Sequence, residues 1–127
     1  MFDLASENDS PPLEFQGALE LFQHDYEFLE RIFKLLLAQV DTDLPTIQEA
    51  VTLRDSQVLA EVTHRLKGSL GSVCAQPSFA TCTALNRSAR HGSVESYAPE
   101  LRSLEHELDR LKPCLEAWLT EREKINT

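Results

Sequence analysis

The sequence predicts an all-α protein, an antiparallel four-helix bundle with an additional short N-terminal helix. Apolar residues recur every three or four positions along most of the chain, which is the spacing of a helix with one buried face. No segment alternates Val, Ile or Thr with polar residues between turn signals, as a β-strand would. With 127 residues, of which 42% are hydrophobic, the chain is the right size for one domain with its own core.

The chain begins with a polar segment and a short helix. Residues 1–12 are rich in Asp, Glu, Ser and Pro, which favours a flexible lead-in. The apolar residues that follow at helical spacing are Phe15, Ala18, Leu19 and Phe22. They predict a short helix with one buried side.

The next helix is predicted to be long. Asp25 is suited to its N-cap, because an Asp side chain accepts hydrogen bonds from the free N–H groups of the first turn. The apolar stripe runs from Leu29 to Val51 and keeps its phase across Pro45. This pattern fits one helix kinked at Pro45, and it also fits two helices broken around residues 41–44.

Two shorter helices are predicted next. The first begins after a cap at Asp55 or Ser56. Its predicted inward positions are Val58, Val62, Leu66, Ser69 and Val73. The second is predicted to run from Pro77, which suits the first turn of a helix, to a stop at Gly92.

The last predicted helix is long and rich in leucine. Ser93 can cap it, and the apolar residues from Leu101 to Trp118 follow in steps of three and four. Pro99 predicts a bend or a late start, and Pro113 predicts a kink. We therefore expect the bundle domain to cover residues 13–122, with a C-terminal tail at residues 123–127.

Charge and cysteine content exclude several classes of protein. A formal net charge of -9 argues against binding to a nucleic-acid backbone. The three cysteines form no CxxC pair, which favours a reducing cytoplasm over a disulfide framework. No apolar run approaches the roughly 18 residues of a membrane span, and the first residues lack the features of a signal peptide. We expect a cytoplasmic monomer that binds neither nucleic acid nor membrane.

The informative segment is HRLKGS at residues 64–69. His64 lies two residues from both Val62 and Leu66, so at about 100° per residue its ring projects away from the buried stripe. The predicted outer face also carries Ala60, Glu61, Lys67, Gly68 and Gly71. Glycine inside a helix costs about 1 kcal/mol relative to alanine, and these two glycines would leave open space for another protein beside the imidazole. Alternatively, either glycine ends the helix as a C-cap.

An exposed imidazole is a candidate nucleophile. The ring is largely neutral at cytoplasmic pH, and a neutral ring nitrogen can attack phosphorus. Lys67 lies about one turn beyond His64 and could offset part of the charge that a phosphoryl group brings. The sequence contains no Walker loop and no kinase-type glycine loop, so we do not expect it to bind ATP.

This segment resembles a known signature. HRLKGS, with Ala75 eleven residues past His64, is similar to the HxLKGS…GA motif of histidine-containing phosphotransfer (HPt) domains. Other positions that resemble the family pattern are Asp55, Leu85, Ala89, Arg90 and Gly92. The similarity covers about residues 13 to 120, and the motif falls on a predicted helix of an all-helical chain.

The resemblance implies a phosphocarrier. His64 would accept a phosphoryl group at Nε2 from a receiver-domain aspartate of a response regulator or a hybrid sensor histidine kinase, or return it. Mg²⁺ would be bound by the receiver, so this chain would hold no metal or other cofactor and catalyse nothing alone. The implied surroundings of the histidine are Lys67, Gly68, Gly71 and Asn86. The expected docking surface consists of Ala60, Glu61, Arg65 and Leu70.

Three residues depart from the family pattern. Cys74 stands where the family usually has the glycine of its GA pair. Asn86 stands where Gln or Glu is commoner, and its shorter side chain leaves open whether it bonds the other ring nitrogen of the histidine. Leu70 replaces a residue that is usually small and is expected to add to an apolar docking patch.

Two other functions stay open. The chain could be a docking module that binds receivers without accepting phosphate. It could also be a metal-binding bundle that uses its histidines (His24, His64, His91 and His106) and cysteines, although no pair of them has the short spacing that places two ligands on one helix face. The sequence fits both a free-standing shuttle and one domain of a larger sensor kinase.

Overall fold

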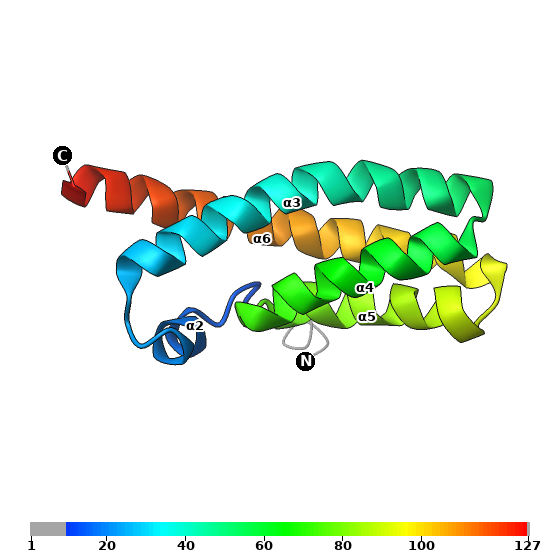
Figure 1. The fold of residues 1–127 in the computed structure, drawn as a ribbon, viewed down its shortest axis with the longest axis horizontal. Coiled ribbons are helices and arrows are strands. Elements are labelled where there is room, and N and C mark those ends of the chain that lie inside the picture. Colours follow the sequence, from blue (N-terminus) through cyan, green and yellow to red (C-terminus); the bar gives the residue numbers. More distant parts are fainter. Residues whose placement is uncertain (1–9, 127) are drawn as a thin grey trace, which may run out of the picture.

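The computed structural model describes residues 10–126, so most of the predicted flexible segment lies outside the described residues. Its elements are α2 (Phe15–Leu21), α3 (Tyr26–Leu53), α4 (Ser56–Ser72), α5 (Gln76–His91), the 3₁₀ turn η1 (Val94–Ser96) and α6 (Tyr97–Asn126). The four long helices form the bundle, and α2 lies near the start of α3 (Figure 1). The predicted fold class is therefore confirmed. None of the described helices is long and apolar enough to cross a bilayer.

Asp side chains begin α3 and α4, as predicted. Asp25 Oδ1 accepts a hydrogen bond from the backbone N–H of Phe28 at 3.0 Å. Asp55 Oδ1 does the same for Val58 at 3.1 Å, which makes Asp55 the cap and Ser56 the first helical residue. Both bonds satisfy donors that a helix start would otherwise leave without a partner.

The prolines inside the long helices do not interrupt them. α3 runs through Pro45 without a break, so the single-helix interpretation is confirmed and the two-helix interpretation is wrong. α6 likewise continues through Pro113 without a break. It begins at Tyr97, so Pro99 lies in the first turn, where its missing N–H leaves no helical hydrogen bond unmade. The late start predicted from Pro99 is confirmed.

Three boundaries differ from the prediction. Ser93 precedes η1, and its side chain makes no capping hydrogen bond, so the predicted cap of the last helix is wrong. α6 continues through Asn126, which makes residues 123–126 part of the helix, in keeping with the helix-forming Glu and Lys there. At the other end, the Ser10 carbonyl accepts a hydrogen bond from Arg110 Nη2, so the described part of the lead-in contacts the bundle.

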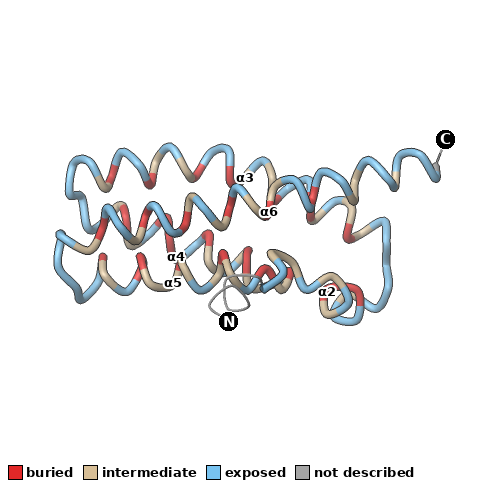
Figure 2. The backbone as a smooth tube through the Cα atoms, turned by 180° about the vertical axis from the view of Figure 1, so that it is seen from behind, coloured by how far each residue is buried: buried red, intermediate tan, exposed pale blue. Residues whose placement is uncertain are grey.

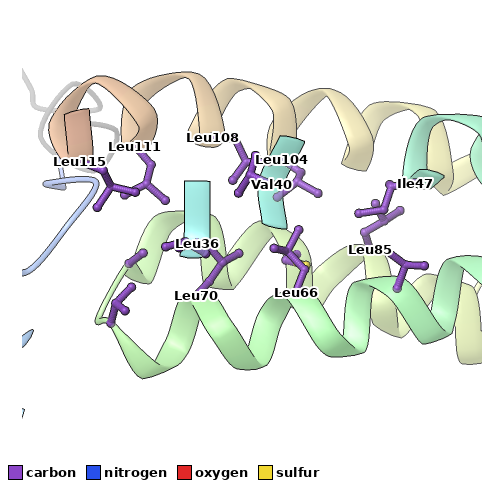
Figure 3. Close-up of a cluster of buried hydrophobic side chains, with 14 of the residues drawn as sticks. Leu36, Val40, Ile47, Leu66, Leu70, Leu85, Leu104, Leu108, Leu111 and Leu115 are labelled. Atoms are coloured by element: carbon purple, nitrogen blue, oxygen red, sulfur yellow. The ribbon is translucent and has the colours of Figure 1, made fainter. Parts of the chain in front are cut away.

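The core is made by the inward stripes of the four long helices. Figure 2 shows buried positions recurring along these helices, and Figure 3 shows the side chains that meet between them. The buried residues labelled there are Leu36, Val40, Ile47, Leu66, Leu70, Leu85, Leu104, Leu108, Leu111 and Leu115. Close packing of these stripes fixes the rotation of each helix and therefore decides which residues face solvent.

The buried face of α4 is rotated slightly from the predicted one. Its buried positions are Leu59, Val62, Thr63, Leu66 and Leu70, whereas Val58 and Ser69 are only partly buried. Leu70 lies four residues after Leu66 and so shares its helix face. Because Leu70 is fully buried, its prediction as a docking residue is wrong.

An aromatic cluster joins α2, α3 and α6 at one end of the bundle. The ring of Trp118 lies 5.1 Å from that of Phe33 and 5.6 Å from that of Phe15, measured between centroids. It also stacks on Tyr26 at 6.5 Å, and the Arg122 guanidinium lies over both stacked rings. These contacts attach the short N-terminal helix to the bundle.

Candidate functional site

His64 projects from the solvent side of α4, as its phase in the sequence predicts. It is exposed, while its neighbours Thr63 and Leu66 are buried. Among the described residues, none makes a hydrogen bond or an ion pair with the His64 imidazole. Both ring nitrogens are therefore available to a group that approaches from outside.

The imidazole lies at a hollow between α4 and α5. The hollow is lined by His64, Lys67, Thr83, Asn86, Arg87, Arg90 and His91. Asn86 and Arg87 each lie three or four residues from both Thr83 and Arg90, so the four positions form one stripe of α5 turned toward α4. Lys67 and Asn86 were predicted for this site, whereas Thr83, Arg87, Arg90 and His91 were not. The three-to-four spacing of the polar residues in the second half of α5 was the available signal.

The hollow is positively charged, although the chain as a whole is acidic. Lys67, Arg87 and Arg90 line it, and no carboxylate is among its lining residues. Glu61, an exposed residue three positions before His64, is the acidic group nearest to it along α4. A unit charge about 4 Å away contributes roughly 1 kcal/mol in water and up to about 4 kcal/mol near a protein surface. Several such cations favour a dianion at the imidazole over the same group in bulk water.

The two glycines of α4 have different surroundings. A Cβ atom built on Gly68 would meet nothing within 4 Å, so the helix face beside His64 is open there, as predicted. A Cβ on Gly71 would lie 3.1 Å from the ring of Phe79. Gly71 thus allows α4 and α5 to pack closely and is not part of the open surface, contrary to the prediction. Both lie inside the helix, so the C-cap alternative is wrong for each.

Asn86 makes its described hydrogen bonds away from the imidazole. The residue is 4% exposed, and Nδ2 donates to the Ala60 carbonyl at 2.9 Å and to Thr63 Oγ1 at 3.0 Å. Oδ1 accepts a hydrogen bond from Arg90 Nε at 3.3 Å. The residue therefore lines the hollow while it connects α5 to the α4 turn that precedes His64.

Arg65, expected on the docking surface, is attached to α3. Its Nη2 atom lies 2.7 Å from Oδ1 of Asp43, a buried residue, and this hydrogen bond raises the pKa of the Arg65 guanidinium. The other carboxylate oxygen of Asp43 accepts from Gln39, which in turn accepts from Ser69. The Arg65 side chain is still 59% exposed. Of the other expected docking residues, Glu61 is exposed and Ala60 is half-buried.

The cysteines lie in three different environments. Cys82 is buried, its thiol donates to the Thr63 carbonyl at 3.4 Å, and burial raises its pKa to about 12. Cys74 has a left-handed backbone with φ of 64°, which explains why a glycine would suit this position. Cys114 is exposed. Among residues 10–126, no group of three or more His, Cys, Asp or Glu side chains is placed to hold a metal ion.

Comparisons with known proteins agree with this geometry. The family model described as Hpt domain matches residues 31–113. The HPT domain from the Hpt sensor hybrid histidine kinase of Shewanella has 21% identity and a TM-score of 0.77, and the match covers 87% of this chain and 95% of that one. A rice structure assigned as a histidine-containing phosphotransfer protein has 20% identity and a TM-score of 0.79, with 98% of this chain and 91% of that one covered. No curated protein matches the sequence.

Proposed function

This chain belongs to the Hpt domain family, and from that premise we propose that it is a histidine phosphocarrier whose acceptor is His64. The observation that carries the proposal is an exposed imidazole, with no described partner, at a hollow lined by Lys67, Arg87 and Arg90. A nucleophile that must meet another protein needs an open approach, and Gly68 leaves one.

The proposed step is an in-line transfer from an aspartyl phosphate of a receiver domain. A neutral imidazole attacks phosphorus through the Nε2 lone pair while its proton stays on Nδ1. The new N–P bond forms as the O–P bond to the aspartate breaks, and the carboxylate leaves with the bonding electrons. The reverse step returns the group to a receiver. Such transfers depend on placement and charge neutralisation, which the exposed ring and the cations of the hollow would supply.

The partners we propose are receiver domains of response regulators and of a hybrid sensor histidine kinase. The receiver would bring Mg²⁺ and its phosphorylated aspartate, so this chain would contribute the nucleophile, the cations and a docking surface. The exposed residues around His64 proposed for docking are Glu61, Arg65 and Gly68, with half-buried Ala60 beside them. We further propose that the chain acts as a cytoplasmic monomer without an ATP site.

The direct test is incubation with a phosphorylated receiver domain and Mg²⁺. We expect the wild-type chain to acquire a label that is acid-labile and alkali-stable, as a phosphoramidate is. His64→Gln should abolish labelling and move the thermal midpoint by no more than a few degrees, because the ring lies outside the core.

The matched control is His91→Gln, since His91 lines the same hollow and is also exposed. This variant should still be labelled. Binding of a receiver with no labelling of the wild-type chain would instead identify a docking module. A thermal midpoint that falls on adding a chelator would favour the metal-binding alternative.

A further inference from the structure

The Asn86 amide has its polar atoms engaged on two sides. Both hydrogens of Nδ2 are used, one by the Ala60 carbonyl and one by Thr63 Oγ1. Oδ1 faces the Arg90 guanidinium. The chemistry of these partners fixes the orientation of the amide, because a carbonyl can only accept and a guanidinium can only donate. Asn86 therefore has no hydrogen left to donate to the imidazole.

The two acceptors of Asn86 belong to the turn of α4 from which His64 projects. In an α-helix the Ala60 carbonyl also accepts the N–H four residues later, which is that of His64. Thr63 precedes His64 and donates its own hydroxyl to the Leu59 carbonyl at 2.6 Å. The Asn86 side chain thus holds the backbone of this turn from the buried side.

The oxygen of Asn86 holds a second group of the site. Arg90 lies one turn later on α5 and lines the hollow, and its Nε donates to Asn86 Oδ1. Arg90 is exposed, so this bond limits the rotamers of a long side chain that would otherwise move freely in solvent. The buried amide of Asn86 therefore connects the α4 backbone at His64 to the Arg90 guanidinium.

We propose that Asn86 is a positioning residue that places His64 through the α4 backbone and Arg90 through its side-chain oxygen, without bonding the imidazole ring. The inference rests on the proposed function for its effect on transfer, but its structural part stands on hydrogen bonds alone. A displacement of about 1 Å at a reacting group can lower a rate by as much as 10²-fold. We therefore expect Asn86→Ala to lower the transfer rate at saturating receiver by about tenfold.

NMR of the histidine ring separates this role from a direct bond to the imidazole. We expect the His64 tautomer populations, read from the ring ¹⁵N shifts at pH 8.5, to be the same in wild type and Asn86→Ala. The backbone amide signal of His64 should shift. Thr63→Val, which removes one acceptor of Asn86 and keeps the shape of the side chain, should shift the same amide signal. A changed tautomer population would overturn the proposal, because it would place Asn86 on the ring.

A measurement on the wild-type chain does not depend on a folded variant. The side-chain amide hydrogens of Asn86 should exchange with solvent slowly, since they are buried and bonded to α4. Exchange as fast as that of an exposed Asn would contradict the hydrogen bonds from Asn86 to Ala60 and Thr63. If no labelling of His64 is found, the proposed function fails, and these two NMR measurements still decide the placement of Asn86.

A double-mutant cycle tests the connection to Arg90. Asn86→Ala should slow transfer less in an Arg90→Met background than in wild type, because part of its effect acts through Arg90. If the two substitutions lower the rate by factors that simply multiply, then Asn86 does not position Arg90.

Discussion

The two glycines of α4 lie on different surfaces of the helix, one open to solvent and one packed against α5. Gly68 and Gly71 lie three positions apart, yet only Gly68 borders open space, while Gly71 faces the Phe79 ring. A glycine inside a helix costs conformational free energy, so each of these two glycines should have a structural or functional role that offsets the cost. At Gly71 the gain is close packing between α4 and α5. A Cβ atom built on Gly68 would have no neighbour within 4 Å, so packing does not explain this glycine. Access to His64 does.

This contrast predicts opposite effects of the same substitution. Gly68→Ala should stabilise the protein by about 0.5–1 kcal/mol, because it removes the glycine penalty without a clash. Gly71→Ala should destabilise it by about 1 kcal/mol or more, since the new Cβ would press on Phe79. Urea denaturation measures both free energies of unfolding. A stabilised Gly71→Ala would contradict the packing role.

A larger side chain at position 68 tests whether partners reach the imidazole across this open face. Gly68→Met adds a long side chain on the open face and should slow transfer from a receiver at least tenfold without lowering the thermal midpoint. Transfer at the wild-type rate would show that partners do not approach across Gly68.

The cysteines give a prediction from burial. Burial raises the pKa of Cys82 to about 12, so at pH 8 its thiol stays protonated, and the thiolate is the reactive form. In the folded protein, iodoacetamide at pH 8 should therefore modify exposed Cys114 and leave Cys82 unmodified. Peptide mapping by mass spectrometry reads the result, and the unfolded chain serves as the control, in which all three should react.

The exposure of a residue could be predicted from the sequence where it depends only on the residue's place in the period of its own helix. The exposure of His64 and the openness at Gly68 follow from the period of α4. The burial of Leu70 was missed because Val58 and Ser69 were assigned to the inner face, which rotated the stripe. Arg87 and His91 were not predicted for the site, and Arg90 was named only for its resemblance to the family pattern. The spacing of polar residues in α5 marks a stripe, but packing between the helices decides that this stripe faces α4.

At the scale of elements, a polar network connects α3 to α4. Asp43, buried on α3, accepts hydrogen bonds from Arg65 and from Gln39, and Gln39 accepts from Ser69. A buried carboxylate is costly unless it is paired and hydrogen-bonded. The network therefore fixes α4 against α3 on the side away from α5, while Asn86 fixes it on the side toward α5.

Removing the cation of this network should destabilise the fold. Arg65→Met leaves Asp43 with Gln39 as its described donor, and we expect a loss of about 1–2 kcal/mol, limited by the exposure of Arg65. Arg87→Met is the matched control, because Arg87 is exposed and forms no described ion pair, and it should leave stability unchanged. Equal stabilities of the two variants in urea would show that the Asp43 pair contributes nothing.

The starts of α3 and α4 were predicted well from the sequence, whereas the Ser93 cap was not. Asp25 and Asp55 cap their own first turns, and such local hydrogen bonds can be recognised without the rest of the fold. The stripe across Pro45 fitted both one helix and two, and the structure shows the single helix. The network at Asp43 could not be predicted, because an acidic residue near a possible helix break gives no sign that it is buried.

Two clusters of side chains lie at different places on the bundle. One is the aromatic cluster of Trp118, Phe33 and their neighbours, which attaches α2 and the end of α6 to α3. The other is the cationic hollow at His64, formed where α4 and α5 meet. Although the chain has a net charge of -9, three of its 12 Lys and Arg residues, Lys67, Arg87 and Arg90, line the hollow beside the proposed acceptor.

Locating the phosphoryl group on the labelled protein tests directly whether His64 is the acceptor. After transfer from a phosphorylated receiver, NMR of the ring nitrogens should show phosphorylation at Nε2 of His64, with His91 of the same hollow unmodified. A phosphoryl group found on His91, on a carboxylate or on no residue of a correctly folded chain would contradict the assignment of His64 as the acceptor.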